Sequence, residues 1–160
     1  MATQKPLQNL IFEPMRLSDL QQVLQIENEC FEDPWSATYF SLSLKRPRSY
    51  EYFYVARCED TVMGYIVFVV LYEEAHILNI AVSTTYQRQG IGKYLLASAL
   101  DKIQTLDGQE VFLEVAVSNL PAQCLYRQFG FRIYSIRKNY YGRHKDAYLF
   151  RKGAPETDAT

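Results

Sequence analysis

The alternation of hydrophobic and polar residues divides the chain into strands and helices. Apolar strand patterns cover residues 10–15, 52–58, 62–71, 75–82, 111–116, 131–137 and 147–152. Apolar residues at helical spacing mark segments 18–31, 36–44, 90–105 and 121–129. Strands and helices alternate in the second half of the chain, which requires parallel as well as antiparallel pairing. The sequence therefore predicts an α/β (α+β) fold with a mixed central sheet of about seven strands flanked by about four helices.

Length and composition are those of one ordered domain. The chain has 160 residues, of which 48% are hydrophobic and 14% aromatic, enough for one continuous core. We expect a single domain over residues 10–152. The flanking residues 1–9 and 153–160 are expected to be flexible, since they are small, polar or charged and contain proline.

Charge limits the partners that the chain as a whole attracts. The formal net charge is −1 and the pI is about 6.1, so we expect no direct binding to nucleic acid and none to membranes. Two basic clusters, at residues 45–48 and 137–145, provide local positive charge unless they are simply solvated loops. No apolar signal segment opens the sequence and no apolar run could span a bilayer, so we expect a cytoplasmic protein.

The three cysteines lack the spacing of a metal site or a disulfide framework. Cys30, Cys58 and Cys124 are odd in number and far apart, and we expect neither a disulfide nor a bound metal. Cys30 and Cys124 fall on predicted apolar helix faces, where a buried, unreactive thiol is the expected outcome.

A glycine-bearing loop between a strand and a helix is suited to binding an anion. The strand ends at residues 78–82, and Gln87-Arg88-Gln89-Gly90-Ile91-Gly92-Lys93 follows. Glycines let a diphosphate approach the backbone, and the free N–H groups at the start of a helix point toward it. A helix start with two turn glycines is the simpler alternative. The dinucleotide fingerprint needs a third glycine and the P-loop needs Lys-Ser/Thr after the last glycine, where this chain has Lys93-Tyr94.

Two residues are candidates for acid–base chemistry. Glu114 interrupts an otherwise apolar strand, where a carboxylate is costly to bury unless it is paired, so it is either a functional base or a solvent-facing or ion-paired residue. Tyr126 lies twelve positions later on the following helix, which could return its hydroxyl toward the end of that strand, although its position by itself favours an aromatic core residue packed with Leu125 and Phe129. Asn119 is the expected N-cap of that helix.

Several separated motifs resemble those of the GNAT acetyltransferases, and among them the RimI-type ribosomal-protein alanine N-acetyltransferases. The resemblance covers nearly all of residues 11–151. The motifs that carry it are Phe31-Glu32-Asp33-Pro34-Trp35-Ser36, the strand and glycine loop at residues 80–93, Leu113-Glu114-Val115, Ser118-Asn119, Leu125-Tyr126, Phe129-Gly130-Phe131, Asn139-Tyr140-Tyr141 and Asp146-Ala147.

The resemblance implies a GNAT fold, acetyl-CoA as co-substrate and direct attack by an amine, without a metal. By resemblance, Glu114 is the proton acceptor and Tyr126 the proton donor. The resemblance also assigns acetyl-CoA binding to Ile80, Ala81, Val82, Arg88, Gln89, Gly90, Ile91, Gly92, Lys93 and Asn119. Trp35, Tyr140 and Tyr141 could line a groove for a peptide substrate, unless they are packing residues.

We therefore expect an N-α-acetyltransferase acting on a protein N-terminus, with the N-terminal Ala of a ribosomal protein as the implied target. Two alternatives stay open: a GNAT enzyme that acetylates a small-molecule amine or a protein lysine, and a non-enzymatic acyl-CoA-binding adaptor. The sequence departs from the family at Ala116, where an Arg usually follows Leu-Glu-Val, and at Pro121 in a segment that is commonly alanine-rich. Neither departure removes Glu114 or Tyr126.

Overall fold

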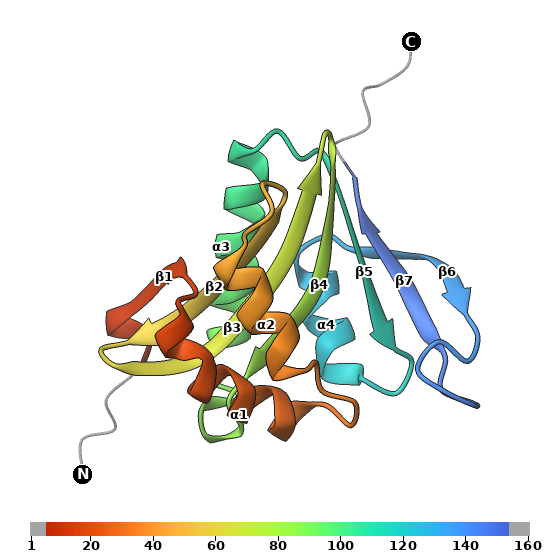
Figure 1. Cartoon of the computed structure of the whole chain (residues 1–160). Helices are drawn as coiled ribbons and strands as arrows, with labels where there is room; N and C mark the ends of the chain where they lie inside the picture. The colour runs from red at the N-terminus through yellow and green to blue at the C-terminus, as the bar shows by residue number, and fades with distance from the viewer. Residues whose placement is uncertain (1–5, 154–160) are drawn as a thin grey trace. The chain divides into compact units, whose positions relative to one another are not determined.

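The computed structural model describes residues 6–153. Seven strands form one sheet in the order β1-β2-β3-β4-β5-β7-β6, accompanied by four α-helices (Figure 1). The strands are β1 (Leu10–Pro14), β2 (Glu51–Cys58), β3 (Thr61–Leu71), β4 (Glu74–Val82), β5 (Glu110–Ala116), β6 (Arg132–Arg137) and β7 (Ala147–Lys152). The α-helices are α1 (Leu20–Cys30), α2 (Ala37–Lys45), α3 (Ile91–Thr105) and α4 (Leu120–Gln128). The predicted mixed α/β fold is confirmed, since β4 pairs with β5 in parallel while β5 and β6 each pair with β7 antiparallel.

By contacts, the chain divides into two compact units. Among the described residues, unit 1 comprises residues 6–68 and 79–100, and unit 2 comprises residues 69–78 and 101–153. Strands β3 and β4 and helix α3 each contribute residues to both units. The expectation of a single domain over residues 10–152 stays a prediction.

In unit 1, α1 and α2 cover one face of the strands. Phe40 of α2 is fully buried, with its ring 5.9 Å from that of Tyr65 on β3 and 6.1 Å from that of Phe53 on β2. Val23 and Ile26 of α1 join the same cluster. The Ser36 hydroxyl caps α2 by accepting a hydrogen bond from Tyr39 N at 3.1 Å.

The start of the first helical segment differs from the sequence prediction. Ser18 with Gln21 has the pattern of a capping box, but a short 3₁₀ helix, η2 (Leu17–Asp19), precedes α1. The Asp19 carboxylate accepts from Arg16 N at 2.9 Å and from the Arg57 guanidinium at 2.8 Å. A long-range ion pair to β2 therefore fixes the entry to α1, because Asp19 is buried and Arg57 neutralises it.

The opposite face of the unit 1 strands packs against α3. A Cβ atom at Gly64 of β3 would lie 3.0 Å from Leu95 Cδ1 of α3 and only 2.7 Å from the carbonyl oxygen of Ala81 on β4. Residue 64 must therefore be glycine for β3, β4 and α3 to approach one another this closely.

In unit 2, the side chains of β5 alternate between a buried face and a half-buried face. Val111, Leu113 and Val115 are buried, whereas Phe112 and Glu114 between them are half-buried. Leu113 lies opposite Phe150 of β7, and Phe150 contacts Tyr126 of α4 with ring centroids 6.0 Å apart. Helix α4 thus covers the Leu113 face, and Glu114 belongs to the other face.

The chain ends lie only partly within the described residues. A 3₁₀ helix, η1 (Pro6–Asn9), occupies the last part of the 1–9 segment for which we predicted flexibility. Residues 1–5 and 154–160 lie outside the described residues, so their predicted flexibility is not tested. Over residues 6–153, no helix combines the length and apolar character needed to cross a membrane.

Candidate active site

The strand–loop–helix segment predicted to bind an anion lies in unit 1. Ile80 and Val82 of β4 are half-buried, and a short 3₁₀ helix, η3 (Thr84–Tyr86), follows them. The chain then takes positive φ angles at Arg88 (63°) and at Gly90 (87°). Such angles are unfavourable for most residues and free for glycine, so Gly90 supplies the turn that leads into α3.

Helix α3 begins directly after this turn. Its first backbone hydrogen bond runs from Tyr94 N to Gly90 O at 3.0 Å. The N–H groups of Ile91, Gly92 and Lys93 precede this bond and have no acceptor within the helix. Together with the helix dipole and the exposed Lys93, they form an anion-binding geometry.

A buried carboxylate that the sequence analysis did not single out lies beside the strand of this segment. Glu27 of α1 is 1% exposed, and its two oxygens accept from Trp35 N and from Asn79 Nδ2, both at 2.9 Å. Asn79 also lies 3.2 Å from the Tyr65 hydroxyl. Burial raises the pKa of Glu27, and these hydrogen bonds partly offset that rise. Its position four residues after Val23, on the apolar stripe of the helix, was the sequence signal for a buried role.

Trp35, a predicted substrate residue, packs within unit 1. Its ring lies 5.1 Å from the ring of Tyr39 and 5.7 Å from that of Phe40, and the residue is half-buried. The backbone N–H of Trp35 donates a hydrogen bond to the Glu27 carboxylate. The structure thus gives Trp35 a packing role, and its contact with a substrate stays a prediction.

The two helix cysteines differ from each other in environment. Cys30 is half-buried, with its thiol 3.3 Å from the carbonyl oxygen of Val82, and burial raises its pKa. Cys124 is exposed, so the prediction that it is buried was wrong. The short α4 turns this position outward while Gln123 and Tyr126 occupy its buried face.

Tyr126, in unit 2, combines a buried ring with an unengaged hydroxyl. The residue is 5% exposed, and its ring packs against Phe131 and Phe150 at centroid distances of 5.9 and 6.0 Å. Burial, with a smaller effect of Tyr141, raises its pKa well above that of an ordinary tyrosine. No hydrogen bond of the described residues engages this hydroxyl, and every fully buried polar side-chain atom among them has a partner. The hydroxyl must therefore keep contact with solvent.

The predicted tyrosine pair lies in the loop between β6 and β7, also in unit 2. Tyr140 and Tyr141 meet edge to face with ring centroids 4.8 Å apart, and they are 41% and 42% exposed. Partial burial, then Tyr140 and Glu114, raise the pKa of Tyr141 to about 12. Since Tyr141 also affects the pKa of Tyr126, it lies within electrostatic reach of both predicted acid–base residues. The fold thus gathers Glu114, Tyr126 and the tyrosine pair in one region of unit 2.

One polar side chain caps helix α4, and a second fixes the helix to the end of β5. Asn119 caps the helix as predicted, accepting from Ala122 N at 3.3 Å. Gln123, which the sequence analysis did not identify, is 4% exposed and donates to Ala116 O at 3.2 Å and to Val117 O at 2.9 Å. These bonds set the position of Tyr126 relative to β5.

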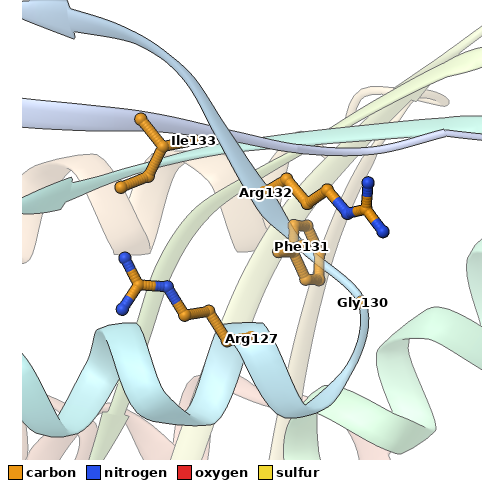
Figure 2. A pocket seen from close by; sticks show the side chains of 5 residues that line it. All are labelled: Arg127, Gly130, Phe131, Arg132 and Ile133. Carbon is orange, nitrogen blue, oxygen red and sulfur yellow. The ribbon is translucent and has the colours of Figure 1, made fainter.

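A surface hollow at the end of α4 is separate from these residues. It has a volume of about 400 Å³ and is lined by Arg127, Gly130, Phe131, Arg132 and Ile133 (Figure 2). The guanidinium groups of Arg127 and Arg132 point in different directions in Figure 2. None of the predicted site residues lines this hollow.

Comparisons with known proteins identify the class of protein. The model of the acetyltransferase (GNAT) family matches residues 20–131, and the chain belongs to that family. It is an N-acetyltransferase of the group that contains the RimI-type enzymes, as its similarity to named members shows.

Three relatives illustrate this similarity. A Bacillus subtilis protein, provisionally named [ribosomal protein bS18]-alanine N-acetyltransferase, is 37% identical over 79% of this chain and 83% of its own length. An N-alpha-acetyltransferase of Sulfolobus acidocaldarius is 34% identical over 83% of this chain and 86% of its own. The crystal structure of the ribosomal-protein-S18-alanine N-acetyltransferase from Escherichia coli is 27% identical, with a TM-score of 0.81 over 94% of this chain and 98% of that chain.

Proposed function

We propose that this enzyme transfers an acetyl group from acetyl-CoA to the N-terminal α-amine of a protein, with the N-terminal Ala of a ribosomal protein as its target. The observation that carries the proposal is the anion-binding start of α3 after Gly90, in a chain that belongs to the acetyltransferase (GNAT) family. The relatives named for N-alpha and bS18-alanine acetylation support the same reaction. The cytoplasm is the proposed location.

The proposed cofactor site is the segment that begins on β4 and ends in α3. The residues assigned to it are Ile80, Ala81, Val82, Arg88, Gln89, Gly90, Ile91, Gly92 and Lys93, with Asn119 as a further contact. The positive φ of Gly90 and the open N–H groups of the first α3 turn fit a diphosphate. Acetyl-CoA supplies the activated thioester.

Glu114 would act as the general base toward the attacking amine, directly or through water. An α-amino group titrates at about 7.7–8.0 and a lysine at about 10.4, so at pH 7.4 deprotonating lysine costs roughly 3–4 kcal/mol more. A carboxylate base therefore deprotonates an N-terminal amine at a lower free-energy cost than it deprotonates a lysine. Backbone N–H groups after residues 80–82 would polarise the thioester carbonyl.

Tyr126 would donate a proton to the departing thiolate. A tyrosine phenol is protonated at neutral pH, burial raises the pKa of Tyr126 further, and its packed ring fixes the direction of the hydroxyl. Glu114 belongs to the half-buried face of β5, whereas α4, which carries Tyr126, covers the buried face.

Tyr140 and Tyr141, with Trp35, are proposed to contact the substrate peptide. Their exposed aromatic surfaces can pack along an extended backbone. If so, Tyr140→Ala should raise the KM for peptide much more than that for acetyl-CoA.

The proposal is tested by incubating the protein with acetyl-CoA and a panel of peptides that differ only in their first residue. Mass spectrometry should show one acetyl group on the α-amine and the fastest reaction with Ala. Acetylation of a polyamine or amino sugar with no peptide product would favour the small-molecule alternative. Calorimetric binding of CoA without turnover of any amine would favour the adaptor.

A further inference from the structure

Glu27 of α1 is a buried carboxylate that the proposed reaction does not use. It is 1% exposed and lies on the apolar stripe of α1, whose residues Val23 and Ile26 belong to the core of unit 1. Burial removes water from a carboxylate, and an apolar side chain of the same size would pack there without that cost. None of the ion pairs found among residues 6–153 includes Glu27. The neutral groups that it binds must therefore explain its place in the core.

Glu27 binds both ends of the segment that connects α1 to Trp35. Its backbone carbonyl accepts from Phe31 N at 3.1 Å, and its carboxylate accepts from Trp35 N at 2.9 Å. Between these two bonds, residues 32–34 are exposed and belong to neither α1 nor α2. A side chain eight residues earlier in the sequence thus fixes the backbone of Trp35, which lies outside the helices and strands.

The other oxygen of the Glu27 carboxylate connects this segment to β4. It accepts from Asn79 Nδ2 at 2.9 Å, and Asn79 Nδ2 also lies 3.2 Å from the hydroxyl of the fully buried Tyr65 on β3. Asn79 directly precedes Ile80, the first residue assigned to acetyl-CoA. One carboxylate therefore joins the proposed cofactor strand to the proposed substrate residue Trp35.

We infer that Glu27 is a positioning residue, which holds the backbone of Trp35 against β4 in the position that binds the peptide substrate. The inference rests on the proposed function, because only that proposal places a peptide at Trp35. Without the carboxylate, the segment before α2 would occupy other positions, and peptide binding would have to restore the right one. Loss of a hydrogen bond to a buried charged acceptor should weaken peptide binding by about tenfold.

The test compares two variants of similar size that differ in hydrogen bonding. Glu27→Met offers no strong acceptor, so it should raise the KM for an Ala-initiated peptide by about tenfold. Its kcat and its calorimetric affinity for acetyl-CoA should change little, because the variant leaves Glu114, Tyr126 and the glycine loop in place. Glu27→Gln keeps an oxygen for Trp35 N, and its amide can donate to Asn79 once the Asn79 amide turns over. It should keep a peptide KM close to that of the wild-type protein.

Asp19→Asn is the matched control for a loss of stability. It weakens another buried carboxylate of unit 1, at the start of α1, which binds Arg16 and Arg57. This variant should lower the urea midpoint of unfolding and leave the peptide KM unchanged. An effect on the peptide KM in Glu27→Met but not in Asp19→Asn would separate positioning of Trp35 from general destabilisation.

A second measurement needs no variant, so it decides the question even if Glu27→Met does not fold. In the wild-type protein, the Trp35 N–H should be protected from hydrogen exchange although it lies outside the helices. Exchange at the rate of an unstructured peptide would overturn the inference.

Three kinetic results are also decisive. An unchanged peptide KM in folded Glu27→Met would overturn the inference while leaving N-terminal acetylation intact. A peptide KM raised equally by Glu27→Gln and Glu27→Met would overturn it as well, because hydrogen bonding to Trp35 would then not be the cause. If the wild-type protein acetylates no peptide, the proposed function fails and the inference fails with it.

Discussion

Tyr126 shows how one position serves both stability and proposed chemistry. Its ring belongs to the unit 2 core with Phe131 and Phe150, and core packing alone would explain an aromatic residue there. A phenylalanine would serve that purpose equally well. The hydroxyl, with a raised pKa and no partner among residues 6–153, is what packing does not explain.

Removing either proposed proton-transfer group should slow turnover without weakening cofactor binding. We expect Glu114→Gln and Tyr126→Phe each to lower kcat by about 10²–10⁴-fold, the usual contribution of general acid–base groups. Calorimetry should show nearly unchanged affinity for acetyl-CoA. Glu110→Gln, on the same face of β5, and Tyr134→Phe, on β6, are the controls and should keep wild-type kcat. Wild-type turnover in both test variants would remove the proposed chemistry.

A single methyl group at Gly64 should disturb the cofactor strand. Its Cβ atom would lie 2.7 Å from Ala81 O, so β3 or β4 must shift, and overpacking of this kind costs about 1–3 kcal/mol. We expect Gly64→Ala to lower the urea midpoint of unfolding and the affinity for acetyl-CoA. Gly153→Ala, where nothing lies within 4 Å, should change neither. A Gly64→Ala protein as stable as wild type would show that the strands are not packed this closely.

At the scale of elements, local sequence signals predicted the helices and strands well. They did not predict the contacts between residues that lie far apart in the sequence. Periodicity located the helices and strands within a few residues, and the cap at Asn119 was predicted because capping is a local interaction. The partners of Glu27 and Asp19 were not predicted. Asn79 lies 52 residues from Glu27, and Arg57 lies 38 residues from Asp19. Only the assembled sheet brings such pairs together.

The glycine turn before α3 should be essential for binding the diphosphate of acetyl-CoA. We expect Gly90→Val to weaken CoA binding, because a side chain there strains the backbone and fills the space for phosphate. Gly130→Val is a closely matched control: Gly130 has a φ of 88° against 87° at Gly90, but lies after α4. It should reproduce the strain and retain CoA affinity. An unchanged calorimetric affinity in folded Gly90→Val protein would contradict the loop assignment.

The ion pair at the start of α1 should make stability depend on acid pH. Burial alone would raise the pKa of Asp19, but hydrogen bonds from Arg57 and Arg16 hold it below its usual 3.8. The carboxylate therefore stabilises the fold above that pH, and the contribution is lost as pH falls through the lower folded value.

Asp19→Asn should accordingly lower the free energy of unfolding by about 1–3 kcal/mol at pH 7, since it weakens a buried charged hydrogen bond. Urea titrations at pH 7, 5 and 3 should show the difference from wild type shrinking only at the lowest pH. The exposed Asp101→Asn is the control and should show almost no difference at any pH. A constant difference across this range would mean that the ion pair does not contribute.

At the scale of the whole molecule, the overall charge conceals a strong local asymmetry. The net charge of −1 combines +7 over residues 120–152 with −8 over the rest of the chain. Composition alone argued against nucleic acid and membrane binding, but it could not show how these charges are distributed. Lys138 and Arg143 lie in the β6–β7 loop, whereas Arg132 pairs with Arg151 at the other end of these strands. The family and the fold follow from motifs spread over the chain.

The measurement that tests the central claim most directly compares two versions of one Ala-initiated peptide that contains an internal lysine. One version has a free N-terminus and the other is blocked. With acetyl-CoA and the wild-type protein, the free peptide should gain one acetyl group, placed on the α-amine by fragment mass spectrometry, and the blocked peptide should stay unmodified. Efficient acetylation of lysine in the blocked peptide would contradict N-terminal acetylation as the function of this enzyme.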